Sequence, residues 1–188
     1  MIILGLIGMP GAGKGECTKY ARSLGFKVVN MGDLVREEAM NQGLELKDEN
    51  VGKIAHRERE KHGYGIWARR TLRKIENMKL EPDELVIIDG IRGSTEVDVF
   101  INAFLDRFKT IAIKMPAERR FELLQKRKRK DAPISRAEFD ERDERESKWG
   151  IKDAIEKADY VIFNTGTLDE LYAAMKELLD VIMLRENK

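Results

Sequence analysis

Short apolar runs alternate with longer segments of helical periodicity along this chain. The runs have the length of β-strands and read as continuous Val, Ile and Leu, which is typical of strands covered on both faces. They span residues 2–7, 27–29, 85–88, 110–115 and 160–163. Because strands that alternate with helices form βαβ units, the pattern predicts an α/β fold, with a five-stranded parallel sheet between two layers of helices.

The last segment gives the clearest helix. Its apolar residues recur at helical spacing from Leu168 to Ile182, Thr167 stands at the N-cap position, and Asp169 and Glu170 occupy the first turn. We expect this helix to pack on the sheet. A helix is also expected over residues 95–104.

Composition limits the kind of protein further. Lys and Arg total 35 against 34 for Asp and Glu, a net charge of +1, which argues against general nucleic-acid binding. The single cysteine, Cys17, excludes a disulfide framework and favours a reducing, cytoplasmic compartment. No stretch approaches the ~18 apolar residues of a membrane span. We therefore expect no membrane partner, and we expect the apolar start to be a strand and not a signal peptide.

A glycine-rich turn joins the first strand to the first helix. Residues 8–14, Gly-Met-Pro-Gly-Ala-Gly-Lys, fit the phosphate-loop pattern G-x-x-x-x-G-K. In such a loop backbone N–H groups face one anion, the helix adds its dipole, and Lys14 supplies a charge for the terminal phosphates. A dinucleotide fingerprint would need glycine where Glu16 or Thr18 stands. Against an ordinary Gly-rich turn, we predict a nucleotide site formed by Gly8, Pro10, Gly11, Ala12, Gly13, Lys14 and Gly15.

The string GMPGAGKG resembles the GxPGxGKG loop of adenylate kinase and other nucleoside monophosphate kinases, in which glycine also follows the lysine. The resemblance implies a P-loop NTPase fold with ATP and Mg²⁺ as cofactors. The family normally has threonine at the next position, where this chain has Glu16. Glu16 is either a magnesium ligand acting through water or an acid that complements the start of the helix.

Two further segments extend the resemblance. Residues 31–36 (MGDLVR) resemble the TGDxLR segment of adenylate kinases, and residues 87–92 (IIDGIR) resemble their LLDGFPR segment, without the proline. Independently of the family, Asp89 follows a buried run and is predicted at the carboxyl edge of the sheet, where α/β proteins bind ligands. There it can orient the water ligands of Mg²⁺. The alternative for Asp89 and Gly90 is a type I′ hairpin turn.

Arg36 and Arg92 each follow one of these strand ends. Guanidinium groups match phosphate oxygens in a bidentate way, so both are candidates to hold the acceptor, together with Asp33 and Gly90. The alternative for Arg36 is an exposed helix arginine. If the acceptor presents a hydroxyl, a carboxylate must take its proton, and Asp33 is the candidate base.

Residues 117–150 are dense in charge. Phosphoryl transfer needs cations that close over the transferring group, and the family carries them on a lid after the fourth strand. The resemblance matches Arg127, also a donor contact, and Arg129 to such a lid, and more loosely Arg142 and Arg145. Arg119 and Arg120 lie in the same region. The basic run of residues 126–130 is alternatively a solvated face or a polyanion patch.

Residues 158–167 (ADYVIFNTGT) resemble the ADxVIxNxG end of dephospho-CoA kinases and the base-binding loop of nucleotide kinases. The resemblance implies that Asn164 and Gly166 pass under the donor base, although their turn chemistry is alternatively structural. The whole pattern resembles an archaeal kinase-like family related to both enzymes. It implies one domain over residues 1–188: a core of 1–30, 81–116 and 158–188, an acceptor-binding insert at 31–80, and a lid region at 117–150.

Other conspicuous residues carry weaker signals. Cys17 reads as a small packing residue. His56 and His62 are six apart, which does not fit the i, i+4 spacing of a helical metal pair. Residues 63–65 with Trp67 either line a pocket for the acceptor base or form a hinge.

These features together predict an ATP-dependent, Mg²⁺-requiring phosphotransferase. Its catalytic residues would be Lys14, Asp89, Arg92, Arg127 and Asp33, with Asp89 and Glu16 near the metal. The preferred acceptor is a nucleoside monophosphate, and the alternative is a ribose hydroxyl, as in dephospho-CoA kinase. A hypothesis of another class is a nucleotide-gated, RNA-associated binding module. The expected state is a monomer or homodimer.

Overall fold

The computed structural model describes residues 1–126 and 135–186, whose strands form one sheet. The strands are β1 (Ile2–Ile7), β2 (Lys27–Asn30), β3 (Leu85–Ile91), β4 (Phe108–Lys114) and β5 (Tyr160–Phe163). All neighbouring strands are parallel, in the order β2-β3-β1-β4-β5. The predicted α/β fold with a five-stranded parallel sheet is therefore confirmed.

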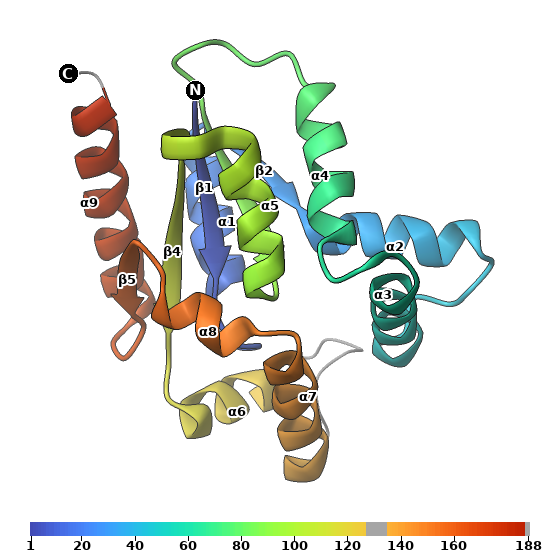
Figure 1. The fold of residues 1–188 in the computed structure, drawn as a ribbon. Coiled ribbons are helices and arrows are strands. Elements are labelled where there is room, and N and C mark those ends of the chain that lie inside the picture. The colour runs from blue at the N-terminus through green and yellow to red at the C-terminus, as the bar shows by residue number, and fades with distance from the viewer. Residues whose placement is uncertain (127–134, 187–188) are drawn as a thin grey trace.

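Helices cover both faces of this sheet (Figure 1). In chain order they are α1 (Lys14–Ser23), α2 (Met31–Asn41), α3 (Asp48–His62), α4 (Ile66–Glu76), α5 (Ser94–Phe104), α6 (Ala117–Lys126), α7 (Arg136–Lys148), α8 (Ile151–Glu156) and α9 (Leu168–Glu186). A 3₁₀ turn, η1 (Leu105–Arg107), precedes β4. The region expected to be helical between β2 and β3 contains α2, α3 and α4.

The central strand β1 shows why two layers of helices form. Its side chains alternate between the faces, so Leu4 and Leu6 pack with α1 and α9, whereas Ile3 and Ile7 pack with α5 and α8. All four are fully buried. Each such burial contributes about 1.5–3 kcal/mol, which explains why strand residues here are apolar on both faces.

The strand β3 is longer than the sequence predicts, running to Ile91 instead of Ile88. Leu6 lies opposite Asp89 but Ile7 lies opposite Ile91, so Gly90 is an extra residue at a bulge, with φ +98°. The hairpin alternative for Asp89 and Gly90 is wrong, because β3 pairs in parallel on both sides. The bulge sits at the carboxyl edge of the sheet, beside the glycine-rich loop.

Candidate functional site

The glycine-rich loop curls over the end of β1 and closes on its own lysine. The Lys14 ammonium donates to the carbonyl oxygens of Gly8, at 2.5 Å, and Met9, at 3.2 Å. The side chain is buried, and this burial, reinforced by the nearby Arg92, lowers the pKa of Lys14 to about 8. The lysine thus carries a charge that is poorly solvated, which an anion in the loop would stabilise.

Gly13 shows why the loop needs glycine. It has φ +106°, and a Cβ there would lie 2.3 Å from Asn164 Nδ2. Asn164 itself follows β5, is buried, and donates to the carbonyl oxygen of Ala12 at 3.0 Å. Asn164 therefore braces the loop from the side, a role that its position near the end of the chain does not reveal.

Asp89 and Asn30 meet at the ends of β3 and β2. They are register partners, and Asn30 Nδ2 donates to Asp89 Oδ2 at 3.1 Å. The side-chain oxygen of Asn30, Oδ1, also accepts from the Gly32 N–H at 2.8 Å, which caps α2. Asp89 is buried and its charge acts on Lys14, so the loop and this strand end share one electrostatic environment.

Arg92 is tied to two buried carboxylates. Its backbone N–H donates to Glu96 at 2.7 Å, and its Nη1 donates to Glu146 of α7 at 2.6 Å. Glu96 also accepts from Arg59 of α3, at 2.8 Å. These contacts join the strand end after β3 to α3, α5 and α7.

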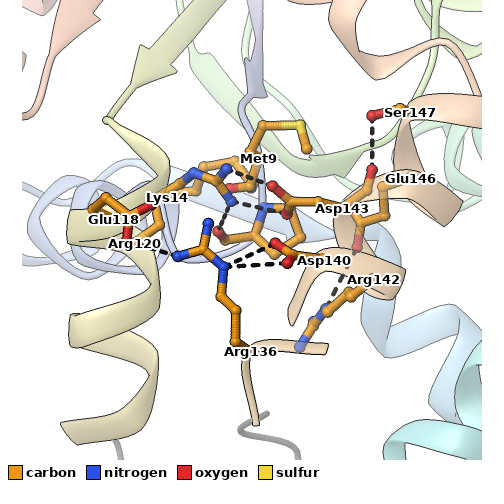
Figure 2. A network of polar contacts seen from close by, with 11 residues as sticks. Met9, Lys14, Glu118, Arg120, Arg136, Asp140, Arg142, Asp143, Glu146 and Ser147 are labelled. Atoms are coloured by element: carbon orange, nitrogen blue, oxygen red, sulfur yellow. Dashed lines mark hydrogen bonds and ion pairs between the residues drawn. The ribbon is translucent and has the colours of Figure 1, made fainter. Parts of the chain in front are cut away.

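Arg120 connects α6 and α7 to the glycine-rich loop. Its guanidinium donates to both oxygens of Asp143, at 2.9 and 2.5 Å, and to the carbonyl oxygen of Pro10 at 3.0 Å. Figure 2 shows this contact beside Lys14 and Met9, with Arg142 and Glu146 further along α7. The helix α7 is therefore held against the loop by a charged bidentate pair.

A single cavity of about 410 Å³ connects these groups. Its lining combines the loop, Lys14 and Asp89 with cations and apolar side chains from the helical segments. The helical lining includes Val35, Arg36, Val51, Ala55, Arg59, Trp67, Arg142, Arg145 and Trp149. The volume fits a small-molecule site. Ten of the lining residues are charged and eight of these are cations, which favours an anionic ligand.

The cavity brings together most of the residues predicted from the sequence. They are Pro10, Gly11, Ala12, Gly13, Lys14, Gly15, Arg36, Asp89, Gly90 and Arg92. Trp67 lines it as well, although its side chain is fully buried and its indole N–H donates to the Ala55 carbonyl oxygen at 3.2 Å.

The remaining predicted residues lie elsewhere. Glu16 pairs with Lys19 of its own helix α1 at 3.0 Å and accepts from the hydroxyl of Tyr172 of α9 at 3.4 Å, and it is not among the lining residues. Asp33 pairs with Arg36 at 2.5 Å and is half exposed, outside the cavity lining. Gly8, Asn164 and Gly166 also lie outside the lining, and the Gly166 carbonyl oxygen accepts from Arg119. Arg127 and Arg129 lie outside the described residues.

Several lining residues are not indicated by the sequence patterns, among them Arg59, Glu146 and Trp149. The Arg59 guanidinium stacks over the Trp149 ring, 4.3 Å from its centroid, so α3 and the end of α7 meet at the cavity. Both polar residues stand in highly charged helices, where a solvated face is the ordinary interpretation. Cys17, by contrast, is buried as expected, and burial raises the pKa of its thiol to about 12.

Comparisons with known proteins place this geometry in context. A family model described as an AAA domain matches residues 7–140. A UPF0200 protein of Thermoplasma volcanium is 44% identical, over 92% of this chain and 93% of its own length. A UPF0200/UPF0201 protein of Archaeoglobus fulgidus is 45% identical over 95% of this chain, which spans only 55% of that relative.

Solved structures share the fold at low sequence identity. A shikimate kinase from Acinetobacter baumannii, in complex with shikimate, has a TM-score of 0.61 at 17% identity, covering 100% of this chain and 96% of its own. A gluconokinase from Sinorhizobium meliloti has a TM-score of 0.59 at 12% identity, covering 98% and 97%. The fold is thus that of P-loop kinases. In the described residues, no helix is both long and apolar enough to cross a membrane.

Proposed function

Because this chain belongs to the UPF0200 family and has the fold of P-loop kinases, we propose that it is an ATP-dependent small-molecule kinase, with a nucleoside monophosphate as its preferred acceptor. The observation that carries this proposal is the shared cavity. It is lined both by the phosphate loop with Asp89 and by arginines of α2, α3 and α7. Donor and acceptor would therefore meet within one cavity, as phosphoryl transfer requires.

The donor side would be formed by the loop. Lys14 is held at present by the carbonyl oxygens of Gly8 and Met9, and a bound triphosphate would offer it stronger, charged acceptors. Loop N–H groups and the N-terminus of α1 add to the same field. This arrangement stabilises negative charge on the transferring group without any covalent step by the protein.

The fit to Mg²⁺ rests on Asp89. Among the described residues no cluster of three His, Cys, Asp or Glu side chains could hold a metal ion. One buried carboxylate beside the phosphate loop suits magnesium, which binds through one or two carboxylates, substrate phosphates and retained waters. Bound there, the ion would neutralise charge on the phosphates. Glu16 contacts Tyr172 of α9, which favours a structural role at the start of α1 over a role as a magnesium ligand.

The acceptor side would be formed by Arg36 and Arg92, with Arg142 and Arg145 nearby. Val35, Val51 and Ala55 offer an apolar wall for a base. A phosphate acceptor attacks with an oxygen that is already anionic, so no general base is needed. Asp33, the base that a hydroxyl acceptor would require, lies outside the lining, paired with Arg36. These placements favour the monophosphate.

A hydroxyl acceptor is the second candidate. Its support is that two proteins of the same fold are named as a shikimate kinase and a gluconokinase. A ribose hydroxyl, as in dephospho-CoA kinase, belongs to the same chemical class. An RNA-associated module draws no support from the described contacts, and it becomes an outcome of the experiment below.

The test is an ADP-release assay with ATP and Mg²⁺ against a panel of nucleoside monophosphates, dephospho-CoA, shikimate and gluconate. Lys14→Ala is the control for contaminating kinases. Release that depends on one monophosphate and disappears in the control supports the proposal. Release that depends on a hydroxyl acceptor transfers support to the second candidate. Slow release that no acceptor stimulates refutes a kinase and leaves an ATPase or binding module.

A further inference from the structure

Glu146 is an unusual residue to find at the cavity. It lies in α7 with 3% of its surface exposed, and a buried carboxylate is costly unless it is paired. It lines the cavity itself and meets Arg92, at 2.6 Å, and Arg142, at 3.7 Å. Burial opposes its ionisation, but the charges of Arg92, Arg142, Lys14 and Arg145 outweigh burial and lower the pKa of this carboxyl. The Glu146 carboxylate is therefore an anion in the wall of the cavity.

The group that Glu146 holds is the cation assigned above to the acceptor. Arg92 follows the bulge at the end of β3, its backbone is fixed by Glu96, and its guanidinium lines the cavity with a quarter of the side chain exposed. One nitrogen of this guanidinium, Nη1, already donates to Glu146. An anionic acceptor and Glu146 thus compete for one guanidinium.

Glu146 has a second cationic neighbour besides Arg92. Its other oxygen faces Arg142, one turn earlier on the same helix, so the carboxylate keeps a cationic neighbour after Arg92 turns away. This matters because removing one partner from a buried pair costs several kcal/mol when the remaining charge has none. The exchange leaves no buried charge uncompensated.

We propose that Glu146 occupies the acceptor's anion site, that the acceptor's phosphate replaces it at Arg92, and that Glu146 thereby selects phosphate over carboxylate. This inference rests on the proposed function and names the group that the acceptor must present. A ligand with a single carboxylate would only replace the equivalent carboxylate of Glu146 at Arg92, so its binding would gain little. A phosphate dianion brings more charge and a third oxygen, so it alone gains from the exchange.

The experiment compares Glu146→Gln with Glu144→Gln. Glutamine keeps the shape of Glu146 and removes its charge, and Glu144 is a matched control on the same helix, exposed and paired with Lys148 at 2.9 Å. Each protein is saturated with ADP and Mg²⁺, so that the phosphate loop is filled, and is titrated calorimetrically with inorganic phosphate and then with acetate. Thermal melting checks that each variant is folded.

We expect Glu146→Gln to bind inorganic phosphate about tenfold more tightly than wild type, as removal of a competing charge predicts. It should also bind acetate, which wild type excludes, and Glu144→Gln should match wild type. Unchanged or weaker phosphate binding by a folded Glu146→Gln would show that Glu146 only positions Arg92, and would overturn the inference. Failure of the proposed kinase function would be seen in a different experiment. In that case the wild-type protein transfers phosphate to no acceptor in the ADP-release assay, whatever Glu146→Gln binds.

Discussion

Asn30 bonds two parts of the cavity at once, capping α2 through its oxygen and holding Asp89 through its nitrogen. Substitutions of Asn30 can separate the capping of α2 from the contact with Asp89. Asn30→Ala removes both and should lower the free energy of unfolding by about 1 kcal/mol through loss of the cap. Asn30→Ser keeps a capping oxygen but is too short to reach Asp89 across the strand pair.

We therefore expect Asn30→Ser to recover most of the stability but not the activity. Both variants should raise the Mg²⁺ concentration needed for half-maximal ADP release, because Asp89 loses the amide that orients it. Urea unfolding and a magnesium titration measure the two effects. If serine restores both, the Asn30–Asp89 contact has no part in catalysis.

The sequence predicts the framework of this site well, for a physical reason. Strands covered on both faces need continuous apolar runs, and a tight anion loop needs glycine at fixed spacing. Both features can therefore be recognised from short stretches of consecutive residues. Parallel order then brings Asp89 to the same sheet edge as the loop. Lys14, Asp89 and Arg92 were all identified in this way and line one cavity.

The helical lining of the cavity was harder to predict. Arg59 and Glu146 are more than eighty positions apart in the chain, and each stands in a run of alternating charge that resembles a solvated surface. Only tertiary packing buries them, 4% and 3% exposed. The bulge at Gly90 was missed for a similar reason, because Asp-Gly locally favours a turn, and pairing with β1 and β2 overrides that preference.

The pKa of Lys14 gives a pH dependence. Burial lowers it to about 8 in the free protein, so Lys14 loses its proton as the pH rises through 8. A bound triphosphate favours the ammonium form, and binding above pH 8 must then take up a proton. We expect ATP affinity to fall by up to about tenfold for each pH unit above 8.

The control for this prediction is Lys14→Arg, since arginine stays charged throughout that range. Calorimetry from pH 7.5 to 9.5, in two buffers of different ionisation enthalpy, measures both affinity and proton uptake. Equal slopes in wild type and Lys14→Arg would assign the pH dependence to another group.

Two glycines of the loop have opposite expected effects. Alanine at Gly13 is strained by φ +106° and meets Asn164 Nδ2 at 2.3 Å, so Gly13→Ala should lose about 1–3 kcal/mol of stability. Alanine at Gly15 meets nothing within 4 Å and favours the helix, so stability should hold or rise. Thermal melts test both.

Gly15→Ala then becomes a probe of ligand approach. If ATP phosphates contact the backbone at the start of α1, the added methyl group must reduce ATP affinity in a protein that is no less stable. Undiminished ATP binding by Gly15→Ala would place the phosphates farther from the helix.

The buried pair of Arg59 and Glu96 predicts a large stability effect. Both side chains are almost fully buried, 2.8 Å apart, and Glu96 also accepts from the Arg92 N–H. Glu96→Ala leaves a buried guanidinium without its partner and should cost about 3–5 kcal/mol. Glu84→Ala, which removes a partly exposed partner of Lys27, should cost at most about 1 kcal/mol. Comparable losses in denaturant unfolding would mean that Arg59 finds another partner.

Asp33 separates the two acceptor classes. It is half exposed and paired with Arg36 at 2.5 Å, so in the monophosphate mechanism its charge only tunes that arginine. Asp33→Asn should then change kcat less than about tenfold, with a modest fall in acceptor KM as Arg36 is released. Arg92→Ala should raise acceptor KM much more, because it removes a charged hydrogen bond to the acceptor. General-base catalysis contributes about 10²–10⁴-fold, so a loss of that size in Asp33→Asn with intact ATP binding would identify a hydroxyl acceptor instead.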